Sequence, residues 1–144
     1  AVGPAAEDVR PVIGRVQRLA VGPRPVSADP ARGEAGNRGA YLVQGPGHCG
    51  DCHTPRTLLM VMNDKAFLAG GRHPEGGGRV PGLRRLIARE RFKDAEDLSL
   101  ALRFGETLGY EDMSSGGMGA VQDKLARLPE EDVAAIAEFL VGLE

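Results

Sequence analysis

The sequence has no tryptophan, few other aromatic residues and only two cysteines. Aromatic residues make up 4% of its 144 residues, so a chain of single-domain length has few large side chains to fill a core. This composition permits, without showing it, a bound apolar group. Two cysteines three residues apart cannot build the disulfide framework of a small secreted protein. The net charge of −2 provides no basic field for nucleic acid, and the apolar runs are too short to cross a bilayer.

The chain changes character between its first third and the rest. Five of the ten prolines lie in the first thirty residues. Within this stretch, apolar residues between Val9 and Leu19 follow helical spacing. We therefore expect a lead-in segment over residues 1–35, with a short helix, followed by one domain over residues 36–144.

The domain is expected to be all-α. Residues 94–104 suit a helix that stops at Gly105, with Leu98, Ala101 and Leu102 inward. A last helix is expected with Leu128 as its cap and Pro129 in its first turn, and one apolar stripe follows: Val133, Ile136, Ala137 and Leu140. Residues 63–88 are rich in glycine and predict a long loop. No segment shows the alternation of a strand.

The strongest motif is Cys49-Gly50-Asp51-Cys52-His53, which has the spacing of c-type haem attachment. Cysteines at i and i+3 of a helical turn project to the same side, so both sulfurs can reach the two vinyl groups of a haem. His53 follows directly and can bind the iron. A thioredoxin-like pair would need a βαβ setting, and a structural zinc site would need a second ligand pair. Neither is present, so the motif predicts one covalent haem c.

The residues around this motif resemble a known family. They are 37–43, Gly45, 47–50 and 52–56, and, further along, 68–71, Pro81, Leu83, Met118 and 135–140. Together they resemble a haem domain of the cytochrome c subunits of membrane-bound alcohol and gluconate dehydrogenases, and more broadly a class I cytochrome c. Because there is one haem motif, the chain is either a relative with one haem or one domain of a larger subunit.

The resemblance implies roles for several residues. The first and last helices would cross beside the haem, with Gly39 permitting close approach and Phe139 packing there. The carbonyl of Pro81 would accept the second N–H of His53, and Leu83 would pack on the haem ring. Met118 would be the second axial ligand of the iron.

The residues alone leave several candidates for the second axial ligand of the haem iron. Met60 and Met62 follow the motif too closely, and His48 adjoins Cys49 on the same side as His53. His73 in the glycine-rich loop would provide bis-histidine ligation. Met113 and Met118 flank a flexible Ser-Ser-Gly-Gly stretch, and Met113 is the main rival of Met118.

Ligation by His53 and Met118 leaves no open position on the iron, which is typical of an electron carrier. We therefore expect no enzyme activity. Electrons would come from a periplasmic dehydrogenase and pass to a cytochrome or an oxidase. A haem enzyme or gas-binding protein is the alternative. We expect a periplasmic location, peripheral to the membrane through a partner subunit, and partner docking around residues 45–48 and the segment before Met118.

Overall fold

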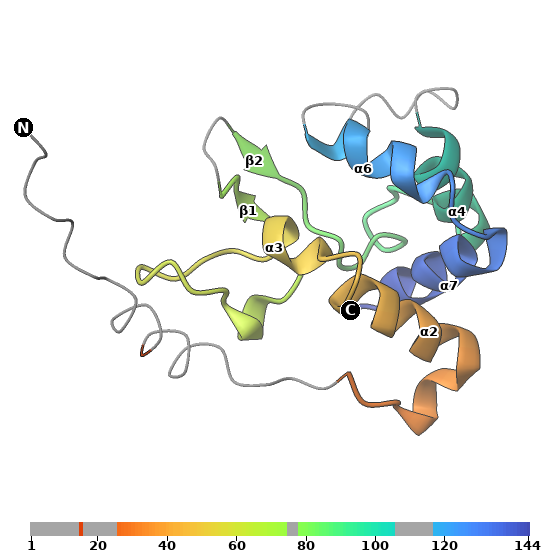
Figure 1. Cartoon of the computed structure of the whole chain (residues 1–144), viewed down its shortest axis with the longest axis horizontal. Helices are drawn as coiled ribbons and strands as arrows, with labels where there is room; N and C mark the ends of the chain where they lie inside the picture. Colours follow the sequence, from red (N-terminus) through yellow and green to blue (C-terminus); the bar gives the residue numbers. More distant parts are fainter. Residues whose placement is uncertain (1–14, 16–25, 75–77, 106–116) are drawn as a thin grey trace, which may run out of the picture.

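The computed structural model describes residue 15 and residues 26–74, 78–105 and 117–144. Its helices and strands, in chain order, are η1 (Pro30–Arg32), α2 (Gly33–Gln44), α3 (Cys49–His53), η2 (Asp64–Ala66), β1 (Gly71–Arg72), β2 (Arg79–Val80), α4 (Ala95–Phe104), α6 (Gly117–Leu125) and α7 (Glu130–Val141). Figure 1 shows α2, α4, α6 and α7 on one side of the domain, with α3 and the loops that follow it on the other.

The central contact of the fold is the crossing of α2 and α7. Gly39 of α2 is buried against the backbone of Ala135, and a Cβ on Gly39 would also lie 2.7 Å from Cβ of Phe139. Only a residue without a side chain allows this approach. The close packing expected of Gly39 and Phe139 is therefore confirmed.

Helix α4 begins and ends where the sequence predicts. The Asp94 side chain accepts a hydrogen bond from the backbone N–H of Asp97 and caps the first turn. Leu98, Ala101 and Leu102 are buried, as expected. Through this face α4 packs on α7, and α6 packs on α4.

The start of α7 differs from the prediction by one residue. Pro129, and not Leu128, is the cap, and its extended backbone precedes the helix that begins at Glu130. The Pro129 carbonyl accepts the backbone N–H groups of Asp132 and Val133. The apolar stripe of α7 is buried as predicted, and Leu128 packs against the core.

The expectation of a plain loop over 63–88, without strands, is wrong in part. The structure has the single turn η2 there, and β1 and β2 pair antiparallel, with Gly71 opposite Val80 and Arg72 opposite Arg79. Strands of two residues are too short to produce an alternating pattern in the sequence. The other named elements of the described residues are helices.

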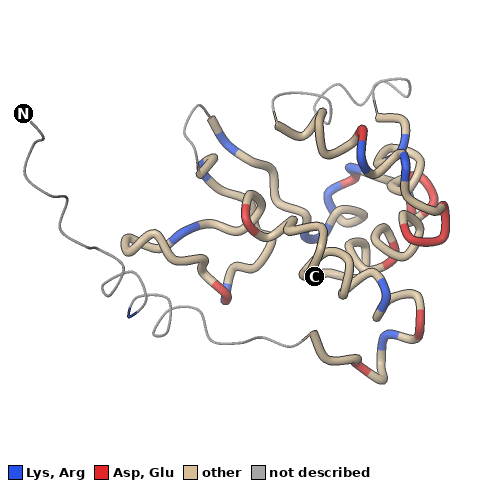
Figure 2. The backbone as a smooth tube through the Cα atoms, in the orientation of Figure 1, with Lys and Arg blue, Asp and Glu red and all other residues tan. Residues whose placement is uncertain are grey.

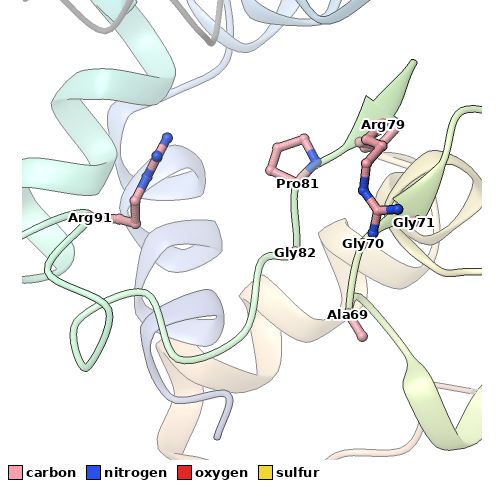
Figure 3. A pocket seen from close by; sticks show the side chains of 8 residues that line it. Ala69, Gly70, Gly71, Arg79, Pro81, Gly82 and Arg91 are labelled. Atoms are coloured by element: carbon pink, nitrogen blue, oxygen red, sulfur yellow. The ribbon is translucent and has the colours of Figure 1, made fainter. Parts of the chain in front are cut away.

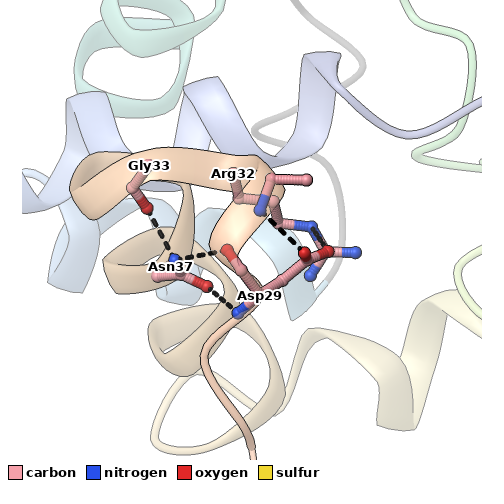
Figure 4. A network of polar contacts seen from close by, with 5 residues as sticks. Asp29, Arg32, Gly33 and Asn37 are labelled. Carbon is pink, nitrogen blue, oxygen red and sulfur yellow. Dashed lines mark hydrogen bonds and ion pairs between the residues drawn. The ribbon is translucent and has the colours of Figure 1, made fainter.

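A small polar network holds the entry to α2 (Figure 4). Asn37 accepts the backbone N–H of Asp29 at 2.7 Å and donates to the carbonyls of Asp29 and Gly33. The Asp29 carboxylate caps η1 through the N–H of Ala31.

The boundary expected between residues 35 and 36 falls inside α2. The short helix expected around 9–19 lies, apart from residue 15, outside the described residues.

Charges of both signs are spread over the described surface (Figure 2). One ion pair joins the two crossing helices, since the Arg38 guanidinium donates to both carboxylate oxygens of Asp132 at 2.7 and 2.9 Å. Among the described residues, no helix has the length and apolar character needed to cross a membrane.

Candidate functional site

The attachment motif forms a short helix of its own, α3, which packs on α2. The turn that leads into it is tied to α2, because the N–H of Gly47 donates to the carbonyl of Leu42 at 2.8 Å. Cys49 is partly buried against the core, whereas Cys52 is exposed. Burial raises the pKa of the Cys49 thiol. The one-turn helix carries the cysteines three positions apart, as attachment to one haem requires.

His53 is buried and held at two points. Its backbone carbonyl accepts the N–H of Gly70 at 2.7 Å, and its Nδ1 lies 2.8 Å from the carbonyl oxygen of Pro81. The next residue, Thr54, is also buried, and its hydroxyl oxygen accepts the N–H of Leu68. The end of α3 is therefore fastened to two separate loop segments.

These two segments, 68–71 and 80–83, pass each other closely. Gly70 has a φ of +76°, and a Cβ there would collide with the backbone of Pro81 and Gly82. A Cβ on Gly82 would lie 2.7 Å from the carbonyl oxygen of Ala69, and the N–H of Leu83 donates to the carbonyl of Leu68 at 2.8 Å. This close apposition brings the Pro81 carbonyl to His53.

The contact with Pro81 determines which nitrogen of His53 is protonated. A carbonyl oxygen can only accept a hydrogen bond, so Nδ1 carries the proton and Nε2 keeps its lone pair. Burial lowers the pKa of His53, and the bond to Pro81 opposes this effect only in part. A neutral imidazole with a bare Nε2 is the form that binds iron.

A cleft of about 480 Å³ opens beside Pro81 (Figure 3). Its floor is backbone and small residues from the two loop segments, and Arg79 and Arg91 line it. In Figure 3 the two arginine side chains stand on opposite sides of Pro81. The volume is in the usual range for a ligand site. The two guanidinium groups suit carboxylates such as the propionates of a haem, whereas Cys49, Cys52, His53 and Met118 do not line this cleft.

The remaining candidates are placed less closely together. Leu83 and Met118 are partly buried and pack, like Cys49, against the same core. Met118 lies in the first turn of α6. Met60 is largely exposed at a loop tip and His48 is exposed, while the backbone N–H of His73 donates to the carbonyl of Gly78. Met113 lies outside the described residues.

Two contributions to this site were missed in the sequence. The hydroxyl of Thr54 and the position of Arg91 in the cleft both depend on loops that fold back over many residues. The one available signal was the density of glycines, Gly70, Gly71 and Gly82 among them, which indicates close backbone approach.

No family model matches the chain. It is 40% identical over 132 residues to a diheme cytochrome c-type protein of Cereibacter sphaeroides, an alignment that covers 91% of this chain and 43% of that protein. It is 34% identical over 120 residues to the fructose dehydrogenase cytochrome subunit of Gluconobacter japonicus, an alignment that covers 81% of this chain and 24% of that subunit. It is 37% identical over 115 residues to the gluconate 2-dehydrogenase cytochrome c subunit of Pantoea cypripedii, which covers 74% of this chain and 25% of that subunit.

These relatives are c-type cytochromes, and the chain is similar to them over 74–91% of its own length. More particularly, it is homologous to the cytochrome c subunits of dehydrogenases, which confirms the resemblance. The chain spans less than half the length of these curated relatives. The homology supports electron transfer by a haem c protein.

Proposed function

We propose that residues 36–144 form a class I cytochrome c domain with one covalent haem c, preceded by the lead-in segment 1–35. The domain carries single electrons from a periplasmic dehydrogenase to a respiratory acceptor, either a cytochrome or an oxidase. The observation that supports this most is the 2.8 Å contact between Nδ1 of His53 and the Pro81 carbonyl, directly after the two cysteines. It prepares Nε2 of His53 for iron.

Each residue of the site has a part in this function. The bound haem supplies a one-electron iron couple. Cys49 and Cys52 would hold it through thioether bonds, and His53 would bind the iron as a neutral imidazole. Met118 would provide a thioether sulfur as the second protein ligand, which favours a high reduction potential. Leu83 packs against the ring.

The two arginines of the cleft have an electrostatic part. Arg79 and Arg91, which line the cleft, would neutralise the propionates and reduce the free-energy cost of burying them. With His53 and Met118 both bound to the iron, no position on it would remain for a substrate. The domain therefore transfers electrons without binding a small molecule.

The experiment is to express the chain with a haem c maturation system and measure its intact mass and its spectrum. We expect the mass of one haem above that of the polypeptide, retained after acid–acetone extraction. Cys49→Ser with Cys52→Ser should lose it. A haem that washes out contradicts the proposal, and strong binding of carbon monoxide would favour a haem enzyme or gas-binding protein.

A further inference from the structure

The loop after α3 forms a narrow hairpin with an apolar tip. Arg56 and Met62 pair as an antiparallel bridge, and the N–H of Thr57 donates to the carbonyl of Val61 at 2.8 Å. The tip consists of Leu58, Leu59 and Met60, whose exposed fractions are 103%, 83% and 63%. In Figure 1 this yellow loop extends away from the helical part of the domain, and in Figure 2 its end carries no charge. We call Leu58–Met60 the apolar tip.

The apolar tip is held in this exposed position by specific bonds. The N–H of Met60 donates to the carbonyl of Thr57 at 2.9 Å, and Met60 has a φ of +61°. The Arg56 guanidinium donates to the carbonyl of Met60 at 3.1 Å. Three consecutive large apolar side chains in water are unfavourable unless another surface covers them. The hydrogen bonds orient the tip for such a surface.

The same arginine connects the tip to the attachment helix. Arg56 also donates to the carbonyl of Asp51, which lies between the two cysteines of α3, at 3.4 Å. At the base of the hairpin, the N–H of Asn63 donates to the carbonyl of Pro55. A protein that grips the tip is thereby positioned beside α3.

We propose that the apolar tip is the anchor by which this domain docks into an apolar socket on the protein with which it exchanges electrons. This inference rests on the proposed function and extends it with an interaction surface. Docking here places the partner close to the helix that bears the haem. A short path between redox centres is what electron transfer requires.

The charges around the tip favour a protein over a lipid surface. Near its base stand two acidic residues, Asp51 and Asp64, and two basic residues, Arg56 and Lys65, so there is no basic excess to attract an anionic bilayer. Stable membrane attachment usually requires two signals, and three apolar side chains provide one. An apolar centre with a mixed polar rim is instead typical of protein interfaces.

The test compares the haem-loaded chain with Leu58→Ser/Leu59→Ser. Its control is Leu100→Ser, because Leu100 of α4 is also exposed but lies far along the chain from the tip. The probe is the dehydrogenase subunit that co-purifies with the tagged chain. Its binding is measured by calorimetry, and haem reduction by stopped flow at several salt concentrations.

We expect the tip variant to bind at least about tenfold more weakly, with an unchanged haem spectrum and salt dependence, while Leu100→Ser behaves as wild type. Equal binding by the tip variant would overturn the docking surface, and an effect of Pro46→Lys, at an exposed position, would instead move it to residues 45–48. Flotation with phosphatidylcholine–phosphatidylglycerol vesicles that is lost in the tip variant would overturn the proposal in favour of a lipid surface. Dimers in sedimentation that are lost in the tip variant would overturn it in favour of a second copy of the chain. Tip-dependent binding of a subunit that does not reduce the haem would keep the docking surface and contradict the proposed function.

Discussion

Nδ1 of His53 lies 2.8 Å from the carbonyl oxygen of Pro81, a residue 28 positions further along the chain. Such a bond orients the imidazole and increases its electron donation to iron. Proline holds the backbone at this position, since its ring restricts φ. If His53 binds iron as proposed, the contact links the conformation of a distant loop to the electronic properties of that ligand.

The first prediction concerns this link. Pro81→Ala should loosen the carbonyl, weaken the bond to His53 and raise the reduction potential, because a weaker donor favours the reduced iron. It should also lower the free energy of unfolding by about 0.4–1 kcal/mol. Protein-film voltammetry and denaturant unfolding measure the two effects. Pro46→Ala, in the exposed turn before α3, is the matched control and should leave the potential unchanged. An unchanged potential in Pro81→Ala would show that this bond does not tune the iron.

The second prediction concerns Met118. Met118→Leu should abolish the weak far-red absorption of thioether-bound iron. It should also lower the potential by roughly 100 mV or more, within the range of about 0.8 V over which axial ligands act. Optical spectra of the oxidised protein and voltammetry measure these changes. Met113→Leu is the comparison. If that variant loses the band instead, Met113 is the ligand. If neither the wild type nor either variant shows the band, His73 is the candidate.

The third prediction concerns the crossing of α2 and α7. Gly39→Ala should destabilise the domain by about 1–3 kcal/mol or more, because the added Cβ collides with the backbone of Ala135. Gly36→Ala, one turn earlier in α2, meets only side-chain atoms, of Arg32 at 3.2 Å and of Glu138 at 3.9 Å, and should be close to neutral. Denaturant unfolding of both haem-loaded variants tests this. Equal effects of the two substitutions would contradict the close crossing.

The fourth prediction concerns pH. The hydrogen bond from Arg38 lowers the pKa of Asp132 below its ordinary value. A carboxyl with a lowered folded-state pKa stabilises the fold above its unfolded pKa, near 3.9, and loses this effect as the pH falls through the folded-state value. Asp132→Asn should therefore be less stable than wild type between pH 5 and 7, and the difference should shrink below about pH 4.

Thermal unfolding across this pH series measures the difference. Arg38→Gln serves as the partner variant. The double variant should lose no more free energy of unfolding than the sum of the losses in the two single variants, since both changes remove the same pair. A difference between wild type and Asp132→Asn that persists at the acid end would show that the ion pair is not its source.

The sequence by itself determined the resemblance to cytochrome c subunits, through the spacing of Cys49, Cys52 and His53. It also determined the main helices, through their caps and apolar stripes. These features are local: a helical turn or a period of 3.6 residues can be recognised without knowing what packs against it. The close approach at Gly39 also followed from the family resemblance. The boundary at Pro129 was off by one residue, because proline is compatible with both the cap and the first turn.

Only the tertiary structure decided how the loops between α3 and α4 are arranged. The passing of Gly70 and Gly82, the bond from Leu68 to Thr54 and the pairing of β1 with β2 join residues that are far apart in the chain. Their spacing has no period to recognise. The apolar tip is a similar case, because Leu58, Leu59 and Met60 are apolar residues of the kind that usually enters a core. In the structure, Arg56 donates to the carbonyls of Met60 and Asp51, four and five residues away, and these bonds accompany the exposed position of the tip.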